Sequence, residues 1–100
     1  MEIKEAQKQS FELLETINNK NNVKHNPDSM FLSLAEEVGE VARELSKKQK
    51  NTKRGEFNKD ELADELADVM SRALVIAEDN DMDRAFQNKL TKIKERFNLK

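Results

Sequence analysis

Apolar residues recur at three- and four-residue steps along four stretches of the chain, which is the pattern of amphipathic α-helices. The first stretch runs from about Ile3 to Asn19, and the second opens with Asn26 as a cap and Pro27 at its first helical position. The third runs from about Asp60 to Asp79, and the fourth follows Asp81, which can cap it. No stretch alternates as a strand does. The pattern predicts an all-α domain of four helices.

Each predicted helix carries one apolar stripe that we expect to face a shared core. In chain order the stripes are Ile3, Ala6, Leu13, Leu14 and Ile17; Phe31, Leu34, Val38, Val41 and Leu45; Leu62, Leu66, Val69, Ala73 and Ile76; and Met82, Phe86, Leu90, Ile93 and Phe97.

Length and composition limit what one chain can bury. The 100 residues fit a single domain spanning 1–100, with 36% hydrophobic and 38% charged residues. So short and so charged a chain cannot bury a large core alone. We therefore expect a four-helix bundle that is completed by homo-oligomerisation.

Charge and residue usage exclude several classes of function. The net charge of -2 gives no overall attraction to nucleic acid or to an anionic membrane, and the absence of cysteine excludes disulfides and thiolate metal sites. No apolar run approaches the ~20 residues that span a bilayer. The N-terminus "MEIKEAQKQS" lacks the basic and then apolar order of a signal peptide, so we expect a cytoplasmic location.

Acidic residues flank the apolar stripes of the second and third helices in the same way. At about 100° of rotation per residue, Glu37 lies roughly 60° and Glu40 roughly 120° from the middle of their stripe. Glu65 and Asp68 repeat these offsets, roughly 60° and 120°, whereas Glu36 points nearly opposite its stripe. If the helices pack antiparallel, four carboxylates converge at the edge of the core. Mg²⁺ or Mn²⁺, which prefer oxygen ligands, would remove the repulsion between them.

Other readings of these residues stay open. Acidic helix faces are commonly solvated and neutralised by partners such as Asp68–Arg72 at i, i+4. Gly39 either leaves room for a neighbour or is a tolerated surface glycine. The lone histidine, His25, fits a surface position near a helix start. A di-iron bundle is excluded, because that site needs Glu-x-x-His motifs.

The acidic motifs also carry a family resemblance. "EEVGE" at 36–40, followed after 24 residues by "ELAD" at 65–68, resembles the EExxE…ExxD signature of the MazG-like nucleoside triphosphate pyrophosphohydrolases. The likeness continues through "LAEEVGEVARELSK", the opening "IKEAQKQSFELLE" and the closing "AFQNKLTKIKERF". It implies an all-α dimer or dimer of dimers. The implied activity is Mg²⁺-dependent hydrolysis of (deoxy)nucleoside triphosphates at the α–β bond, as nucleotide-pool house-cleaning.

The resemblance also implies roles for individual residues. Metal ligands would be Glu37, Glu40, Glu65 and Asp68; Glu36 would be a general base or an ion-pair partner; and Lys89, Arg96, Lys53 and Arg54 would meet the substrate's phosphates.

The chain departs from its relatives near the base pocket. It has no tryptophan, and Ile93 stands where many relatives have asparagine. Phe31 and Phe57 are the nearest aromatic candidates for contact with a base, although Phe31 also fits the core. Two rival interpretations remain, a phosphoribosyl-ATP pyrophosphohydrolase and a non-enzymatic helical interaction module whose acids only face solvent.

Overall fold

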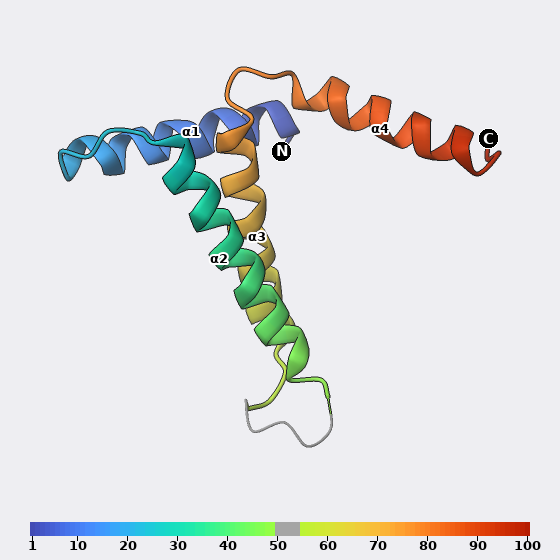
Figure 1. Ribbon diagram of the computed structural model, residues 1–100, viewed down its shortest axis with the longest axis horizontal. Helices are drawn as coiled ribbons and strands as arrows, with labels where there is room; N and C mark the ends of the chain where they lie inside the picture. The colour runs from blue at the N-terminus through green and yellow to red at the C-terminus, as the bar shows by residue number, and fades with distance from the viewer. Residues whose placement is uncertain (50–54) are drawn as a thin grey trace.

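Four helices form an open, T-shaped arrangement in the computed structural model, which describes residues 1–49 and 55–100 (Figure 1). Neither described range contains a strand, so the prediction of an all-α chain with four helices is confirmed. The helices are α1 (Ile3–Lys20), α2 (Pro27–Ser46), α3 (Lys59–Ile76) and α4 (Met82–Arg96).

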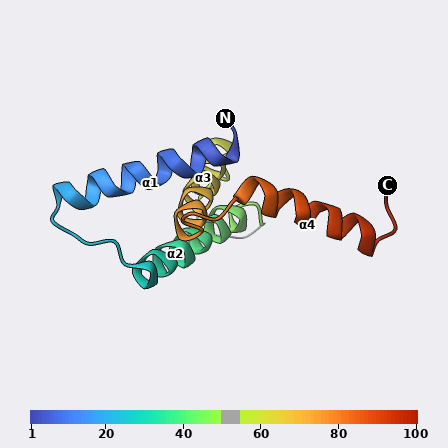
Figure 2. The same ribbon diagram turned by 90° about the horizontal axis from the view of Figure 1, so that it is seen from above.

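The helices α2 and α3 lie side by side and antiparallel, and they form the stem of the T (Figure 1). Helix α1 crosses the end of α3, while α4 leads away from the stem and contacts α1 (Figure 2). Within the described residues the four helices therefore do not close into a bundle in one chain. None of these helices combines the length and the hydropathy that crossing a bilayer requires.

Helix α3 is shorter at its C-terminus than the apolar pattern predicts. It begins at Lys59 and ends at Ile76 instead of continuing to Asp79. The reason is local, because Glu78 adopts a positive φ of 49°, which a helix cannot continue through. The freed Glu78 carbonyl accepts a hydrogen bond of 2.6 Å from the Gln7 side chain, which ties α1 to this end of α3.

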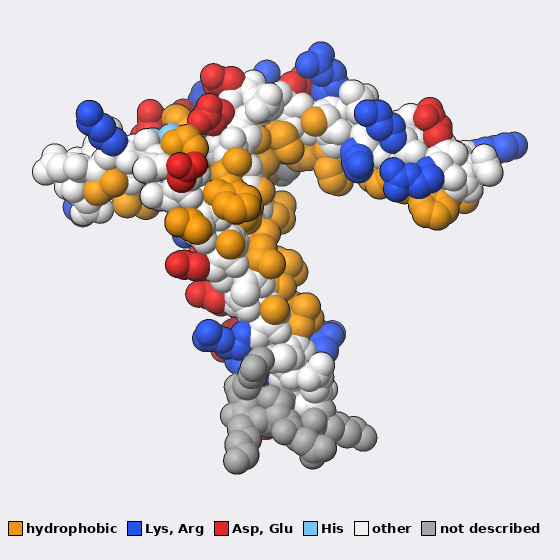
Figure 3. Space-filling view, viewed as in Figure 1, with side chains coloured by type: hydrophobic (Ala, Val, Ile, Leu, Met, Phe, Trp, Pro, Cys, Tyr) orange, Lys and Arg blue, Asp and Glu red, His pale blue; other side chains and the backbone are white. Residues whose placement is uncertain are grey.

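Much of the apolar surface that the sequence assigns to a core is exposed in the single chain. Val75 is the one hydrophobic residue of the described ranges that is fully buried, at 3% exposed. Phe31, expected in the core, is 61% exposed, and Phe97 on α4 is 63% exposed. Hydrophobic side chains line the inner corner between the stem and α4 (Figure 3). The expected core is therefore incomplete within one chain, because no helix covers these side chains.

The dimensions of the chain agree with this exposure. Its radius of gyration is 16.7 Å, whereas a compact domain of 100 residues has about 13 Å. Its accessible surface is 8427 Å², whereas a compact monomer of this mass exposes about 5,800 Å². The single chain thus exposes far more surface than a self-sufficient domain of its size.

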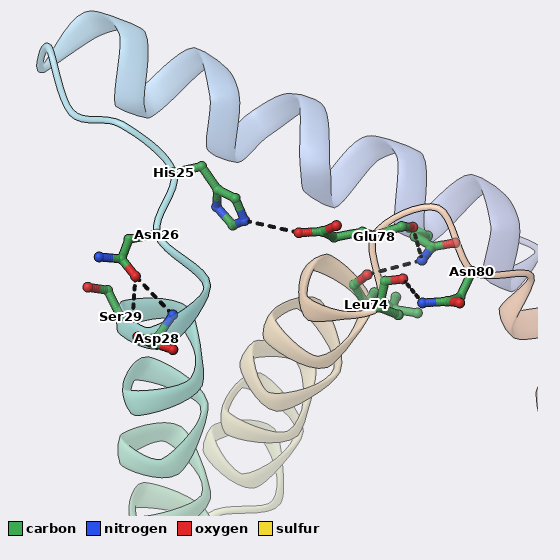
Figure 4. Close-up of polar contacts among 9 residues, drawn as sticks. His25, Asn26, Asp28, Ser29, Leu74, Glu78 and Asn80 are labelled. Carbon is green, nitrogen blue, oxygen red and sulfur yellow. Dashed lines mark hydrogen bonds and ion pairs between the residues drawn. The ribbon is translucent and has the colours of Figure 1, made fainter.

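Side-chain caps fix where the helices begin, as the sequence predicts for α2 and α4. The Asn26 side chain accepts hydrogen bonds from the backbone N–H groups of Asp28 (2.9 Å) and Ser29 (3.3 Å), as Figure 4 shows. Asp81 accepts from the N–H of Arg84 at 3.1 Å and begins α4. These bonds satisfy donors that a helix start otherwise leaves unpaired.

Replacing the α2 cap tests its contribution to stability. We expect Asn26→Ala to lower the free energy of unfolding by about 1 kcal/mol, because two backbone N–H groups lose their acceptor. Urea denaturation followed by circular dichroism measures the change. Asn26→Asp retains the acceptor and should restore most of the loss. Asn19→Ala, on the exposed surface of α1, is the matched control and should not destabilise the protein.

Candidate metal centre

Three carboxylates from the two stem helices meet at one place. Glu37 of α2 and Glu65 and Asp68 of α3 each offer a carboxylate oxygen, and the three oxygens lie within 4.8 Å of one another. None of the three side chains is fully exposed. The antiparallel packing of α2 and α3 thus brings together three of the four acids that the sequence analysis expects to converge.

Two oxygens in this cluster lack a hydrogen-bond donor. Oε2 of Glu37 and Oε2 of Glu65 are buried, and neither has a partner. A buried carboxylate oxygen without a donor is energetically unfavourable. A hard cation with oxygen ligands satisfies such atoms, so the donor set fits Mg²⁺ or Mn²⁺.

Crowding changes the acidity of both glutamates. A hydrogen bond with Glu40, then burial, then the negative charges of Glu40, Glu37 and Asp68 raise the pKa of Glu65 to about 7. Burial, followed by the charges of Glu40 and Asp68, raises the pKa of Glu37, while Arg72 opposes the rise. Without a cation, Glu65 is therefore partly protonated near neutral pH, at a pKa of about 7.

Arg72 supplies positive charge beside the cluster. Its Nη2 lies 3.7 Å from Oε1 of Glu37, and its Nη1 lies 3.7 Å from Oδ1 of Asp68. Its Nε donates a hydrogen bond of 3.3 Å to the hydroxyl of Ser33. The i, i+4 spacing indicates the contact with Asp68, but nothing in the sequence indicates the contact with Glu37 across the helix pair. One arginine only partly neutralises three acids.

The remaining residues of the first acidic motif lie at the margin of the cluster. Glu40 is exposed and outside the group of three, although it contributes to the raised pKa of Glu65. Glu36 is exposed and outside the group, in line with its predicted outward direction. A Cβ added at Gly39 would meet no atom within 4 Å, so no close neighbour requires glycine in the single chain.

The predicted phosphate-binding bases do not gather at the cluster within one chain. Lys89 and Arg96 are exposed on α4, which runs away from the stem (Figure 1). Lys53 and Arg54 lie outside the described residues. Of the aromatic candidates, Phe57 is half-buried beneath the ammonium of Lys48, which lies 4.4 Å from the ring centroid.

His25 is not the surface residue that the sequence suggests. Both its ring nitrogens are buried, and Nε2 lies 3.7 Å from Oε1 of Glu78 (Figure 4). The ring meets Phe11 edge-on, with centroids 6.0 Å apart. The histidine therefore joins the α1–α2 connection to the end of α3, away from the acidic cluster.

An open groove of about 650 Å³ lies elsewhere, between α1 and the α3–α4 connection. Phe11 and Met82 form apolar parts of its lining. Its charged lining comprises Lys4, Lys8, Glu12, Glu15, Glu78, Asp79 and Asp81. Because acids outnumber bases there and no cluster residue reaches it, this groove does not suit a polyanionic ligand.

Comparison with known protein families places part of the chain in a described family. Residues 25–98 match the family model of the MazG nucleotide pyrophosphohydrolase domain. This range includes α2, α3 and α4, and therefore every carboxylate of the cluster. A search of curated proteins and a search of solved structures each gave no match.

The raised pKa of Glu65 predicts how stability depends on pH without divalent cations. The folded protein binds this proton more tightly than the unfolded chain does, because the pKa is about 7 instead of 4.5. The stabilisation from protonation is complete below pH 4.5 and is lost as the pH rises through 7. Glu65→Gln removes this loss, so we expect the variant to gain stability relative to the parent between pH 5 and pH 8.

Chemical denaturation in EDTA at several pH values measures this difference. Asp64→Asn is the matched control, because Asp64 is the exposed neighbour of Glu65 and lies outside the cluster. An equal pH dependence in the parent and in Glu65→Gln would contradict the crowding of carboxylates.

Proposed function

The chain belongs to the MazG nucleotide pyrophosphohydrolase family, and we propose that it hydrolyses (deoxy)nucleoside triphosphates at the α–β phosphate bond. The products are a nucleoside monophosphate and pyrophosphate, and the role is house-cleaning of the nucleotide pool. One observation carries the proposal, namely the convergence of Glu37, Glu65 and Asp68 from the two family motifs. Two unpartnered buried oxygens among them support a cation-dependent site.

The proposed cofactor is Mg²⁺, with Mn²⁺ as a substitute. Glu37, Glu65 and Asp68 would hold it, and Glu40 would join them, since it is close enough to Glu65 to raise the pKa of that carboxyl. A bound divalent cation supplies a Lewis acid for phosphate oxygens and lowers the pKa of water. An acidic site needs such an ion, because a triphosphate carries the same sign of charge as the protein carboxylates.

The chain's own side chains have separate proposed tasks. Glu65 loses its proton when the cation binds, since metal ligands must be deprotonated. Arg72 holds Glu37 and Asp68 by the 3.7 Å contacts and offsets part of their repulsion. Glu36 is the proposed general base or ion-pair partner at the solvent side, where it is exposed. Lys53 and Arg54, in the connection between α2 and α3, are proposed to meet the pyrophosphate end of the substrate.

A second copy of the chain is the proposed partner that completes the bundle. The surplus of about 2,600 Å² over a compact monomer of this mass is of the size that obligate dimers bury per chain, about 1,000–2,500 Å² or more. Helix α4 has an apolar stripe along one side and several bases elsewhere, among them Lys89 and Arg96, and most of its side chains are exposed. We propose that α4 of one copy packs on the stem of another and brings Lys89 and Arg96 towards its acidic cluster.

The competing function is a helical interaction module in which the acids are structural. The contacts of Arg72 with Glu37 and Asp68 favour that alternative, because they neutralise part of the cluster without a metal. Magnesium titration separates the two functions. A preformed metal site gains thermal stability from Mg²⁺ by mass action, and an interaction module gains little.

Removing ligand charge tests the proposed enzyme. We expect Glu37→Gln and Glu65→Gln each to reduce Mg²⁺-dependent pyrophosphate release by about 100-fold or more, since a three-acid cation site loses a ligand. A panel of ribo- and deoxyribonucleoside triphosphates, with phosphoribosyl-ATP as a further substrate, measures turnover. Circular dichroism confirms that the helices persist.

Asp64→Asn is again the matched control and should keep full turnover, whereas Glu36→Gln reports on the proposed general base. Undiminished turnover in both Glu37→Gln and Glu65→Gln would remove the proposed site. Turnover of phosphoribosyl-ATP alone would reassign the substrate and keep the site.

Disrupting the apolar side of α4 tests the proposed oligomer. We expect Phe97→Glu to shift the protein from dimer or tetramer to monomer in light scattering, because an ionised side chain would replace a ring buried between copies. Asn88→Glu, almost opposite the stripe on the same helix, is the control and should leave the oligomer intact. A parent protein that is monomeric at micromolar concentration would contradict the proposal.

Mixing two inactive variants tests whether the site is shared between copies. If α4 acts on the partner's cluster, a mixture of Glu65→Gln and Lys89→Ala chains regains activity in the mixed dimers. In such a dimer, one of the two sites combines the intact Glu65 of one chain with the intact Lys89 of the other. Activity that remains at the sum of the separate variants would place Lys89 outside a shared site.

A further inference from the structure

Glu44 is the most deeply buried charged residue of the described ranges, at 5% exposed, although it lies outside both acidic motifs. Both of its carboxylate oxygens have partners. Oε1 accepts a hydrogen bond of 2.9 Å from the backbone N–H of Asn58, and Oε2 lies 2.8 Å from the ammonium of Lys47. Lys47 also lies 3.6 Å from Glu61 of α3. Glu44 therefore joins the end of α2 to the beginning of α3.

The partner of Glu44 is the residue at which α3 begins. The Asn58 side chain accepts hydrogen bonds from the backbone N–H groups of Asp60 (2.8 Å) and Glu61 (3.1 Å), so it is the N-cap. Its own N–H is the donor to Glu44. One residue thus determines where α3 starts and, through its backbone, where that start lies along α2.

The contact between Glu44 and Asn58 is separated from the acidic cluster by the same number of residues on both helices. Glu44 follows Glu37 by seven residues on α2, and Asn58 precedes Glu65 by seven residues on α3. Seven residues are about two helical turns and return to nearly the same face. In an antiparallel pair, contact of Glu44 with Asn58 therefore places Glu37 opposite Glu65.

We propose that Glu44 is a positioning residue, which fixes the register of α3 on α2 and thereby holds Glu37 and Glu65 at the spacing that a divalent cation requires. The inference rests on the proposed function, because it takes the acidic cluster to be a metal site. A slip of one turn moves α3 by about 5.4 Å along α2. This displacement exceeds the 4.8 Å within which the three ligand oxygens lie. A register error of one turn would therefore separate the ligands.

Burial explains why this role falls to a charged residue. A carboxylate that is withdrawn from water needs strong donors in fixed directions. The Lys47 ammonium lies three residues from Glu44 at the end of α2 and accompanies it in any register, whereas only the native register supplies the Asn58 N–H. Other registers therefore leave Oε1 of this carboxylate without its donor from α3. The packing of apolar side chains is less selective, since shifted helices can still bury them.

Two substitutions of Glu44 and one control test the proposal. Glu44→Met removes the acceptor for the Asn58 N–H, whereas Glu44→Gln retains an acceptor and loses the ion pair with Lys47. Asn58→Ala is the control, because it removes the side-chain cap and destabilises α3 but keeps the backbone N–H that binds Glu44. All measurements are made without substrate, under conditions in which circular dichroism shows the helices to be folded.

The first readout is the affinity for Mn²⁺, measured by electron paramagnetic resonance. We expect Glu44→Met to weaken binding about tenfold or more, as residues that support metal ligands typically do. Glu44→Gln should weaken binding less, and Asn58→Ala should bind as the parent does. Parent affinity in Glu44→Met would overturn the proposal and leave Glu44 as a stabilising residue only. If Glu44→Met does not fold, the comparison of Glu44→Gln with Asn58→Ala decides.

The second readout is the register itself. The natural chain contains no cysteine, so nitroxide labels at Ala35→Cys and Ala67→Cys, both exposed, report the distance between α2 and α3. We expect Glu44→Met to shift or broaden the distance distribution and Asn58→Ala to leave it unchanged. An unchanged distribution in Glu44→Met would overturn the register role. If the parent binds no Mn²⁺, the proposed metal site fails, and the distances still decide the role of Glu44.

Discussion

The acidic cluster depends on the antiparallel contact between α2 and α3, because this contact forces carboxylates of two helices into one place. Glu37, Glu65 and Asp68 repel one another, and buried oxygens of the two glutamates have no donor. The single chain responds by raising the pKa of both glutamates and by placing Arg72 against the cluster. An arrangement this unfavourable for an isolated helix pair is well suited to a divalent cation.

Large apolar surfaces around the stem have no covering helix in one chain. Helix α4 and large parts of the apolar stripes have no covering partner, and the surface area exceeds that of a compact monomer. Burial of apolar side chains is the main favourable contribution to folding, which is why we propose a second copy as the partner of these surfaces. The bases of α4 are exposed beside its apolar stripe, so the proposed oligomer would bring them towards the proposed site as well.

Periodicity and residue type were sufficient for the four helices, for the caps Asn26 and Asp81 and for the outward direction of Glu36, since these depend on neighbours within one turn. They missed Asn58 as the cap of α3. Phe31 and the α4 stripe are exposed in one chain, because an apolar stripe shows that a face is to be covered and not which chain covers it. Periodicity also missed the end of α3, where a contact from Gln7 to the Glu78 carbonyl accompanies the break in the helix.

The amino-acid sequence by itself determined the four helices and the carboxylate side chains that flank their apolar stripes, because helical rotation and residue type are local properties. It contains "ELAD" twice, at 61–64 and 65–68, and both copies offer a glutamate and an aspartate at the same spacing. Helical rotation already favours the second copy, whose Glu65 lies roughly 60° from the apolar stripe, and Glu61 and Asp64 are indeed exposed. Only the tertiary structure decided that Glu65 and Asp68 meet Glu37 and that Glu40 stays outside this group of three. Which acids of two helices converge depends on the position of one helix against the other, which local sequence does not specify.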